Sequence, residues 1–252
     1  MKKTITATLL AATLTTQLSA DFLGAEVGYA GWYPSVSGTV QDQGRGSSIN
    51  FEDDLGFDGG EFNGFAWAYF DHFIPLIPNV KVQQTNYSSS STKIINTDVR
   101  FNIHDYSGTK TTTDLQLNQL DLIAYWRILD NWVNLDLGIM VKQLDGYVTL
   151  TNSVQSDSAD LSSTIPMAYV KARFDLPFTG LSVEADFARF SYDGSNVTDM
   201  KGGVVYQSSI GLGATVGMKH QSFKLGDTTL INSEADIDVD IDGVYAGLFF
   251  HF

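Results

Sequence analysis

Charged side chains recur at every second position in several segments, where they alternate with apolar side chains. Lys171, Arg173 and Asp175 follow this pattern in one segment, and Glu184 and Asp186 follow it in another. If such charges share one enclosed space, they must pair, because an unpaired charge away from water is costly. Such a set either fills a closed interior with ion pairs or lines a narrow passage and sets its ion selectivity.

The full set of candidate interior charges is drawn from most of the chain. Its members are Glu26, Lys81, Asp136, Lys142, Lys171, Arg173, Asp175, Glu184, Asp186 and Lys219. We expect a core packed with ion pairs, because barrels of about eight strands are filled by side chains, whereas open channels have about 16 to 18 strands. A narrow passage is the alternative.

Four aspartates near the C-terminus are the candidate metal ligands. Asp236, Asp238, Asp240 and Asp242 share one face of an extended segment, with apolar residues on the other face. Carboxylate oxygens are the ligands that Ca²⁺ and Mg²⁺ prefer. The spacing is not that of an EF-hand, so we expect a solvated strand face and predict neither a metal nor another cofactor.

The sequence contains few residues that are suitable candidates for catalysis. His104 lies beside Asp105, and Ser88 to Ser91 are close in sequence. Adjacent residues of a strand point to opposite faces, so His104 and Asp105 cannot readily act as a base and its orienting acid. The chain has no G-x-S-x-G elbow, H-E-x-x-H helix or phosphate-binding loop, and we predict no catalytic residues and no enzyme activity.

The elements that position these residues are β-strands. In the run NWVNLDLGIMVK from Asn131, apolar side chains alternate strictly with polar or small ones. The same period of two returns in LSVEADFA from Leu181 and in GLGATVGMK from Gly211. A period of two indicates strands with one apolar and one polar face.

Connection lengths favour a membrane barrel over a soluble sandwich. Short turns are predicted at 75–79, 129–131, 176–180 and 208–211, and long polar connections at 34–60, 91–110, 152–160, 193–199 and 226–236. The two kinds alternate along the chain. Outer-membrane barrels show this asymmetry, with short periplasmic turns, longer extracellular loops, an apolar exterior and a polar interior.

The fold class that follows is all-β, a single closed antiparallel transmembrane barrel. We predict ten strands, at 22–33, 61–73, 79–90, 111–128, 131–151, 161–176, 180–192, 199–208, 211–225 and 237–252, with eight strands as the alternative. The apolar phase shifts between Leu117 and Leu120, which suggests a β-bulge there.

Aromatic residues predict two belts at the membrane surfaces. One belt would lie beside the short turns and the other beside the long connections. The first contains Phe73, Trp126, Trp132, Phe178 and Phe252, and the second contains Trp32, Tyr33, Phe190 and Tyr192.

Composition excludes several classes of protein. The 252 residues have a net charge of -14 and no clustered Lys or Arg, which argues against a nucleic-acid partner. The chain has no cysteine, so disulfides and thiolate metal sites are excluded. Lys2 and Lys3 precede an uncharged run ending at Ala20, which predicts a signal peptide at 1–20 and a barrel domain at 21–252.

The C-terminus carries the most specific motif. The chain ends DGVYAGLFFHF. In this motif Tyr245 and Gly247 are two positions apart, and so are Phe250 and Phe252. This ending resembles the terminal signal of small Gram-negative outer-membrane β-barrel proteins of the OmpA-barrel and OmpW-like kind. The resemblance implies recognition by the barrel-assembly machinery through strand pairing. No segment resembles the peptidoglycan-binding domain of OmpA, so tethering to the cell wall is not implied.

The sequence therefore predicts a non-enzymatic protein of the Gram-negative outer membrane, either structural or a narrow porin-like passage for small solutes. The expected partners are membrane lipid, lipopolysaccharide and the assembly machinery, and we expect a monomer. Two alternatives stay open. One is a barrel enzyme acting on lipid or peptide at the outer surface, and the other is a secreted soluble β-barrel that binds a small apolar ligand.

Overall fold

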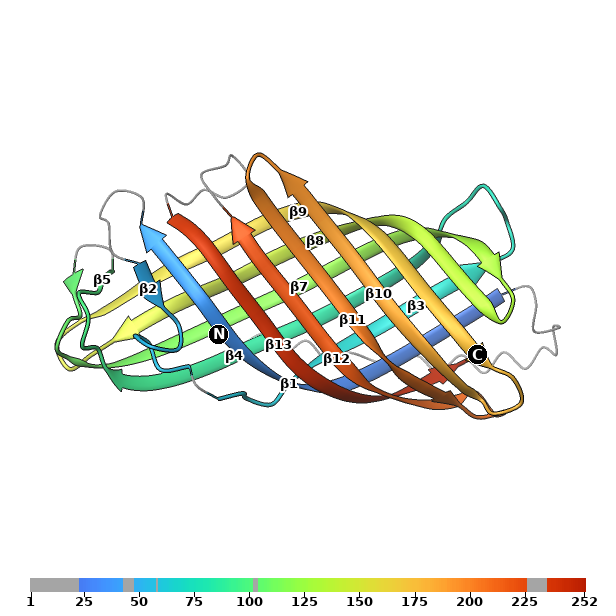
Figure 1. The fold of residues 1–252 in the computed structure, drawn as a ribbon, viewed down its shortest axis with the longest axis horizontal. Helices are drawn as coiled ribbons and strands as arrows, with labels where there is room; N and C mark the ends of the chain where they lie inside the picture. The colour runs from blue at the N-terminus through green and yellow to red at the C-terminus, as the bar shows by residue number, and fades with distance from the viewer. Residues whose placement is uncertain (1–22, 43–47, 58, 102–103, 226–234) are drawn as a thin grey trace, which may run out of the picture.

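The computed structural model describes residues 23–42, 48–57, 59–101, 104–225 and 235–252. Ten long strands form one closed antiparallel barrel, as predicted (Figure 1). They are β1 (Leu23–Asp42), β3 (Asn63–His72), β4 (Asn79–Ile94), β7 (Lys110–Asp130), β8 (Val133–Thr151), β9 (Ser156–Leu176), β10 (Leu181–Tyr192), β11 (Ser195–Gln207), β12 (Leu212–Leu225) and β13 (Ala235–His251). The predicted signal peptide lies outside the described residues.

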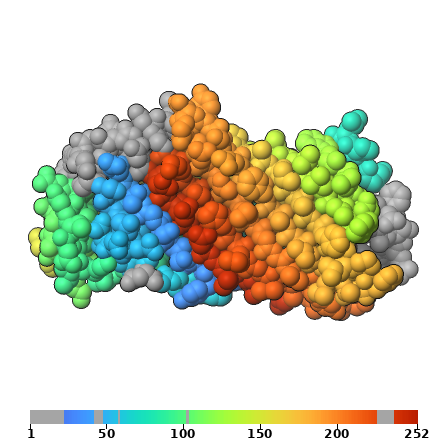
Figure 2. Space-filling view, viewed as in Figure 1, coloured from blue at the N-terminus to red at the C-terminus, as the bar shows by residue number. Residues whose placement is uncertain are grey.

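Closure joins the two ends of the chain. β13 pairs with β1 over a continuous register from Glu26↔His251 to Asp42↔Ala235. Figure 2 shows the last strand, in red, lying directly beside the first strand, in blue. Each other long strand pairs with its neighbour in chain order, so none of the ten long strands leaves a full-length edge. A closed ladder pairs the backbone groups, which a bilayer requires.

The predicted short turns are present, but two of the predicted long connections are wrong. β8 ends at Thr151 and β9 begins at Ser156, and only Asp193 and Gly194 separate β10 from β11. Asp193 and Gly194 have φ of 46° and 80°, typical of a tight hairpin turn. Residues 156–160 and 195–199 look like loops because their outward side chains are polar, although they pair as strands.

An apolar band surrounds one section of the barrel. On five strands the exposed apolar residue nearest the outer edge of the band lies two positions from an outward polar residue. The apolar residues are Val141, Phe187, Met200, Met218 and Val244, and the polar ones are Gln143, Arg189, Thr198, His220 and Asp242. A band of this kind is suited to lipid and is not the surface of a soluble β-barrel. The soluble alternative is therefore disfavoured.

The strands continue beyond the band, and there the apolar face changes sides. On β7, Leu122 is 49% exposed on the exterior, whereas Leu117 is only 8% exposed and faces inward. On β13, Val244 faces outward and Ile241 is buried inside. The section of the barrel that carries the band has an apolar exterior. The section beyond the band, which we call the projecting section, has an apolar interior. This arrangement is the one expected where a wall leaves lipid and enters water.

The same reversal explains the phase shift between Leu117 and Leu120. The bulge predicted there is wrong, because β7 and β8 pair in continuous register from Thr112 to Arg127. The observed irregularity lies between Arg127 and Leu129, near the short-turn end. The phase shift marks the edge of the band instead.

The aromatic belt predicted beside the long connections is only partly correct. Tyr33 and Tyr192 are exposed, at 54% and 64%. Trp32 is fully buried in the interior, and Phe190 packs against the interior core. Trp32 alternates with Tyr33 along β1, so the two rings cannot share a face.

Short strands and turns cover the projecting end. β2 (Ser48–Asn50) pairs with β1, and β5 (Arg100–Phe101) pairs with β6 (His104–Asp105). In Figure 1, β2 and β5 lie at the end of the molecule opposite the C-terminus. None of the described residues forms a helix long and apolar enough to cross a membrane.

Candidate functional site: the interior of the barrel

All ten predicted interior charges face the inside of the barrel. They are inward because each occupies the opposite parity to the apolar residues of the band on its strand. Lys142 and Lys219 are almost fully buried, whereas the side chain of Asp175 is 36% exposed at the short-turn rim. The pattern of alternation therefore located these side chains correctly, although it did not indicate which of them meet.

The centre of the barrel is closed by a network of hydrogen bonds. Lys142 Nζ lies 2.7 Å from Asp121 Oδ1 and 2.9 Å from Asp199 Oδ2, and Lys219 Nζ lies 2.9 Å from Asp199 Oδ1. Gln119 and Gln221 complete the network. We call these six residues the central network, and none of its members is more than 8% exposed. Sequence reasoning missed four of them. Gln119 and Asp121 fall where the apolar phase reverses, and Asp199 falls at the border between a predicted long connection and a predicted strand.

A second cluster lies next to the central network. Lys81 Nζ is 2.8 Å from Asp186 Oδ2, and Lys201 Nζ is 3.3 Å from the same oxygen. Lys171 Nζ is 3.0 Å from Glu184 Oε2. Each ammonium therefore has a carboxylate partner, as buried charges require. Lys201 was not among the predicted charges, although its inward parity on β11 would have identified it.

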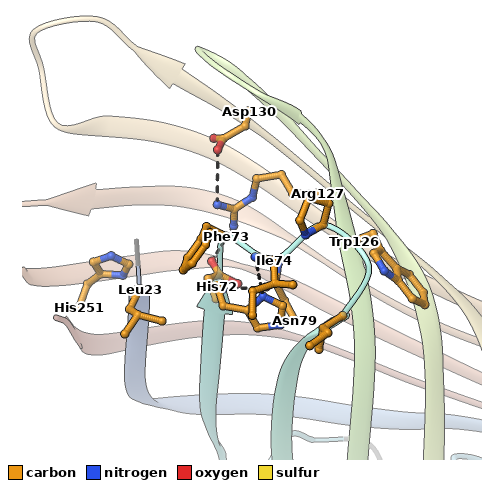
Figure 3. A pocket seen from close by; sticks show the side chains of 13 residues that line it. Leu23, His72, Phe73, Ile74, Asn79, Trp126, Arg127, Asp130 and His251 are labelled. Carbon is orange, nitrogen blue, oxygen red and sulfur yellow. Dashed lines mark hydrogen bonds and ion pairs between the residues drawn. The ribbon is translucent and has the colours of Figure 1, made fainter. Parts of the chain in front are cut away.

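A vestibule opens at the short-turn end. Arg127 there donates to Asp71 at 2.6 Å and to Asp136 at 3.3 Å. Tyr125 also donates to Asp71. A cavity of about 640 Å³ at the rim is lined by Arg127, His72 and His251 among others (Figure 3), and one of about 210 Å³ lies further in. The next two cavities, lined by Lys81 and Lys201, hold only about 20 and 10 Å³. The free space therefore narrows to the size of a water molecule.

An apolar core fills the projecting section, on the side of the central network away from the short turns. Trp32, Tyr87, Leu144 and Ile165 are each 1% exposed or less. Turns add side chains from the outside end, namely Phe51, Leu55 and Phe57 from one segment and Val99 and Tyr106 from another. The vestibule is open to one side only, because both the central network and this core stand between it and the far end.

His104 has a partner that its sequence neighbours did not reveal. Its Nδ1 lies 2.7 Å from Asp157 Oδ2, and the hydroxyl of Tyr106 donates to the same oxygen at 2.7 Å. Burial raises the pKa of Tyr106 above its usual value, and the bond to Asp157 raises it further. Asp105 does not take part in this pair with His104, as predicted. Hydrogen bonds from the Ser107 hydroxyl and backbone N–H lower the pKa of Asp105.

Asp238, Asp240 and Asp242 lie on the exterior of the projecting section. Asp242 is 2.6 Å from His220 Nδ1, and Asp238 is 2.6 Å from Lys224 Nζ. The side chain of Asp236 lies outside the described residues. Within the described ranges no group of three His, Cys, Asp or Glu residues could hold a metal ion. Asp238 and Asp242 are therefore each paired with a side chain of β12 on the exterior of the barrel.

The residues of the predicted terminal signal divide between the two faces of β13. Tyr245 is buried inside, with its ring centroid 5.5 Å from that of Phe65. Phe250 and Phe252 face outward, with ring centroids 4.8 Å apart. Gly247 pairs with Ala30 on β1 and Thr215 on β12. The signal is therefore built into the closing strand of the barrel, and its role in assembly stays a prediction.

Comparison with solved structures shows which known fold this architecture resembles. The chain superimposes on the outer membrane protease OmpT of Escherichia coli with a TM-score of 0.59, at 12% identity, over 96% of this chain and 100% of that one. The fold is that of an outer-membrane β-barrel. At this identity the likeness shows the fold alone, and the predicted Gram-negative outer-membrane location agrees with it.

Two further similar structures are more distant. The translocator domain of the autotransporter NalP from Neisseria meningitidis gives a TM-score of 0.46 at 11% identity, over 91% of this chain and 88% of that one. The Ail protein of Yersinia pestis gives a TM-score of 0.38 at 10% identity, over 90% of this chain and 99% of that one. Both scores are too low to support an inference. No protein-family model matches the chain, and no curated protein matches its sequence.

Proposed function

We propose that this chain is a non-enzymatic, structural β-barrel protein of the Gram-negative outer membrane, with a sealed interior. One observation carries the proposal. The central network joins opposite walls of the barrel at the outer edge of the apolar band, and its members are at most 8% exposed. An interior closed by direct contacts between side chains leaves no water-filled path for solutes.

The apolar core adds a second barrier. It lies between the central network and the outer end and contains large rings such as Trp32 and Tyr87. An ion crossing it would lose its hydration without gaining polar partners. The porin-like alternative is therefore the less favoured of the two readings, and the rigid projecting section is the part of the protein that can present a surface to the exterior.

Single-channel recording in a planar bilayer tests the sealed interior. The refolded chain is first shown to be inserted by its heat-modifiable electrophoretic mobility, and an established porin in the same membrane is the positive control. We expect no discrete current steps from this chain. Regular steps that depend on its concentration would refute the proposal and favour the narrow passage.

A hydrolytic role is the second candidate, and the contact between His104 and Asp157 is the observation that favours it. A carboxylate on Nδ1 orients an imidazole and leaves Nε2 free to accept a proton. Among the described residues, Asp157 is the polar partner of His104. Turnover of fluorogenic peptides or lipid esters that is lost in both His104→Ala and Asp157→Asn would overturn the non-enzymatic proposal.

The expected partners follow from the same architecture. The apolar band would contact membrane lipid, and the polar projecting section would contact lipopolysaccharide. Recognition by the assembly machinery would use β13, the strand that closes the barrel. Crosslinking from position 252 to the assembly machinery during biogenesis would test the last of these, with Phe252→Ala expected to lower the yield of folded barrel.

A further inference from the structure

The wall of the barrel has a notch at its short-turn rim. The last pair between β4 and β7 is Asn79↔Tyr125, but β7 continues to Asp130 along β8. The turn 73–78 lies beside this unpaired stretch and leaves the cavity of about 640 Å³ (Figure 3). We call this cavity the rim notch.

The rim notch is lined from both faces of the wall. Leu23 and Trp126 belong to the lipid-facing side and are 56% and 38% exposed. Arg127 and Asp71 belong to the inner side, yet they line the same space. Neighbours on a strand point to opposite faces, so a cavity that contacts both Trp126 and Arg127 reaches from lipid to vestibule. Its occupant would touch apolar and charged surfaces together.

The charged side of the notch offers one donor and one acceptor. Arg127 uses Nη2 and Nε for Asp71 and Asp136, but Nη1 has only a 3.9 Å contact with Asp130, too long for a hydrogen bond. The side chain of Asp130 is 71% exposed. A guanidinium edge recognises phosphate well, and a free carboxylate beside it recognises an ammonium group.

We propose that the rim notch binds the head group of a zwitterionic phospholipid of the phosphoethanolamine type. The phosphate contacts Nη1 of Arg127, and the ammonium contacts the carboxylate of Asp130. The acyl chains lie against Leu23, Ile74 and Trp126, three exposed apolar residues of the notch. A purely anionic head group is less suitable, because Asp71 and Asp130 would repel the charge that no ammonium balances.

Native mass spectrometry of the full chain, refolded in nanodiscs with equal amounts of phosphatidylethanolamine and phosphatidylglycerol, tests the proposal. The two lipids carry the same acyl chains. We expect one retained lipid, with phosphatidylethanolamine preferred. Asp130→Asn should reduce that preference by about two- to fivefold, the range for an exposed ion pair. Asp160→Asn, an exposed carboxylate at the projecting end, is the matched control and should leave the preference unchanged.

Two soluble probes identify the source of the head group. Phosphoethanolamine should displace the retained lipid weakly, because it lacks the acyl chains, and inorganic phosphate should not displace it at comparable concentration. Equal lipid ratios in the wild type and in Asp130→Asn would overturn the proposal, as would displacement by inorganic phosphate alone. Unchanged heat-modifiable mobility in both variants shows that the barrel has folded, so a negative result is not one of misfolding.

Discussion

The side-chain amides of Gln119 and Gln221 form two reciprocal hydrogen bonds, of 2.8 and 2.7 Å, across the full width of the barrel. They belong to β7 and β12, and four long strands lie between these on either side of the sheet order. Opposite walls are thus in direct contact. Lys142 bonds to Gln119, and Gln221 bonds to Asp199, so the amide pair links the two ammonium–carboxylate groups into one network.

Removing one charge from this network should destabilise the barrel strongly. Lys142→Met leaves Asp121 without its ammonium partner, and an uncompensated buried charge costs about 3–5 kcal/mol. The free energy of unfolding in guanidinium, measured in detergent micelles, gives the value. Lys224→Met removes an exposed pair with Asp238 and should have little effect. A loss equal in the two variants would show that the central network does not hold the walls together.

The position of the membrane boundary can be tested on a single strand. Leu122→Arg places a charge on the lipid-facing exterior near the edge of the apolar band, and the cost there lies between about 1 kcal/mol, as near the interface, and about 2–4 kcal/mol, as at the midplane. Asn118→Arg changes the same exterior face four residues earlier on β7, in the projecting section, and should be tolerated. Folding yield in lipid vesicles is the measurement. Equal yields for the two variants would place the boundary elsewhere.

A glycine on β12 makes room for an aromatic ring. A Cβ added at Gly213 would lie 2.0 Å from the ring of Phe249, whereas one at Gly202 would have its nearest neighbour at 3.8 Å. Gly213→Ala should therefore cost about 1–3 kcal/mol through overpacking, and Gly202→Ala should be almost neutral. Combining Gly213→Ala with Phe249→Leu should recover part of the loss. Failure of this double variant to recover any stability would contradict the steric explanation.

Tyr106 should make the cover of the projecting end sensitive to alkaline pH. Its pKa is raised in the folded state, so its contribution to stability is complete below the unfolded value near 10 and is lost as the pH rises beyond it. Tyr106→Phe removes the hydrogen bond to Asp157 and should increase hydrogen exchange in 95–101 and 104–109 at pH 8. The difference between wild type and variant should shrink at pH 11. A difference that stays constant would rule out this role of the hydroxyl.

Sequence alone determined the strands and the parity of their side chains. The period of two follows from backbone geometry, which every residue of a strand obeys, so all ten strands and the inward direction of charges such as Lys142 and Asp186 could be predicted. Connections were less reliable. At Ser156 to Asp160 the outward face is polar because it meets water, and the weak apolar signal resembles that of a loop.

Only the tertiary structure decided where along each strand the apolar face changes from the exterior to the interior, and which side chains meet. Leu117 and Leu122 are both apolar residues of the same alternating strand pattern. Leu117 lies in the interior core and Leu122 faces lipid, because the surroundings of the wall change from water to lipid between them. Gln119 and Gln221 are 102 residues apart, and their contact depends on how the closed sheet brings opposite walls together. Arg127 and Asp130 became candidates for binding because β7 extends past β4, a difference in pairing that no local pattern of residues encodes.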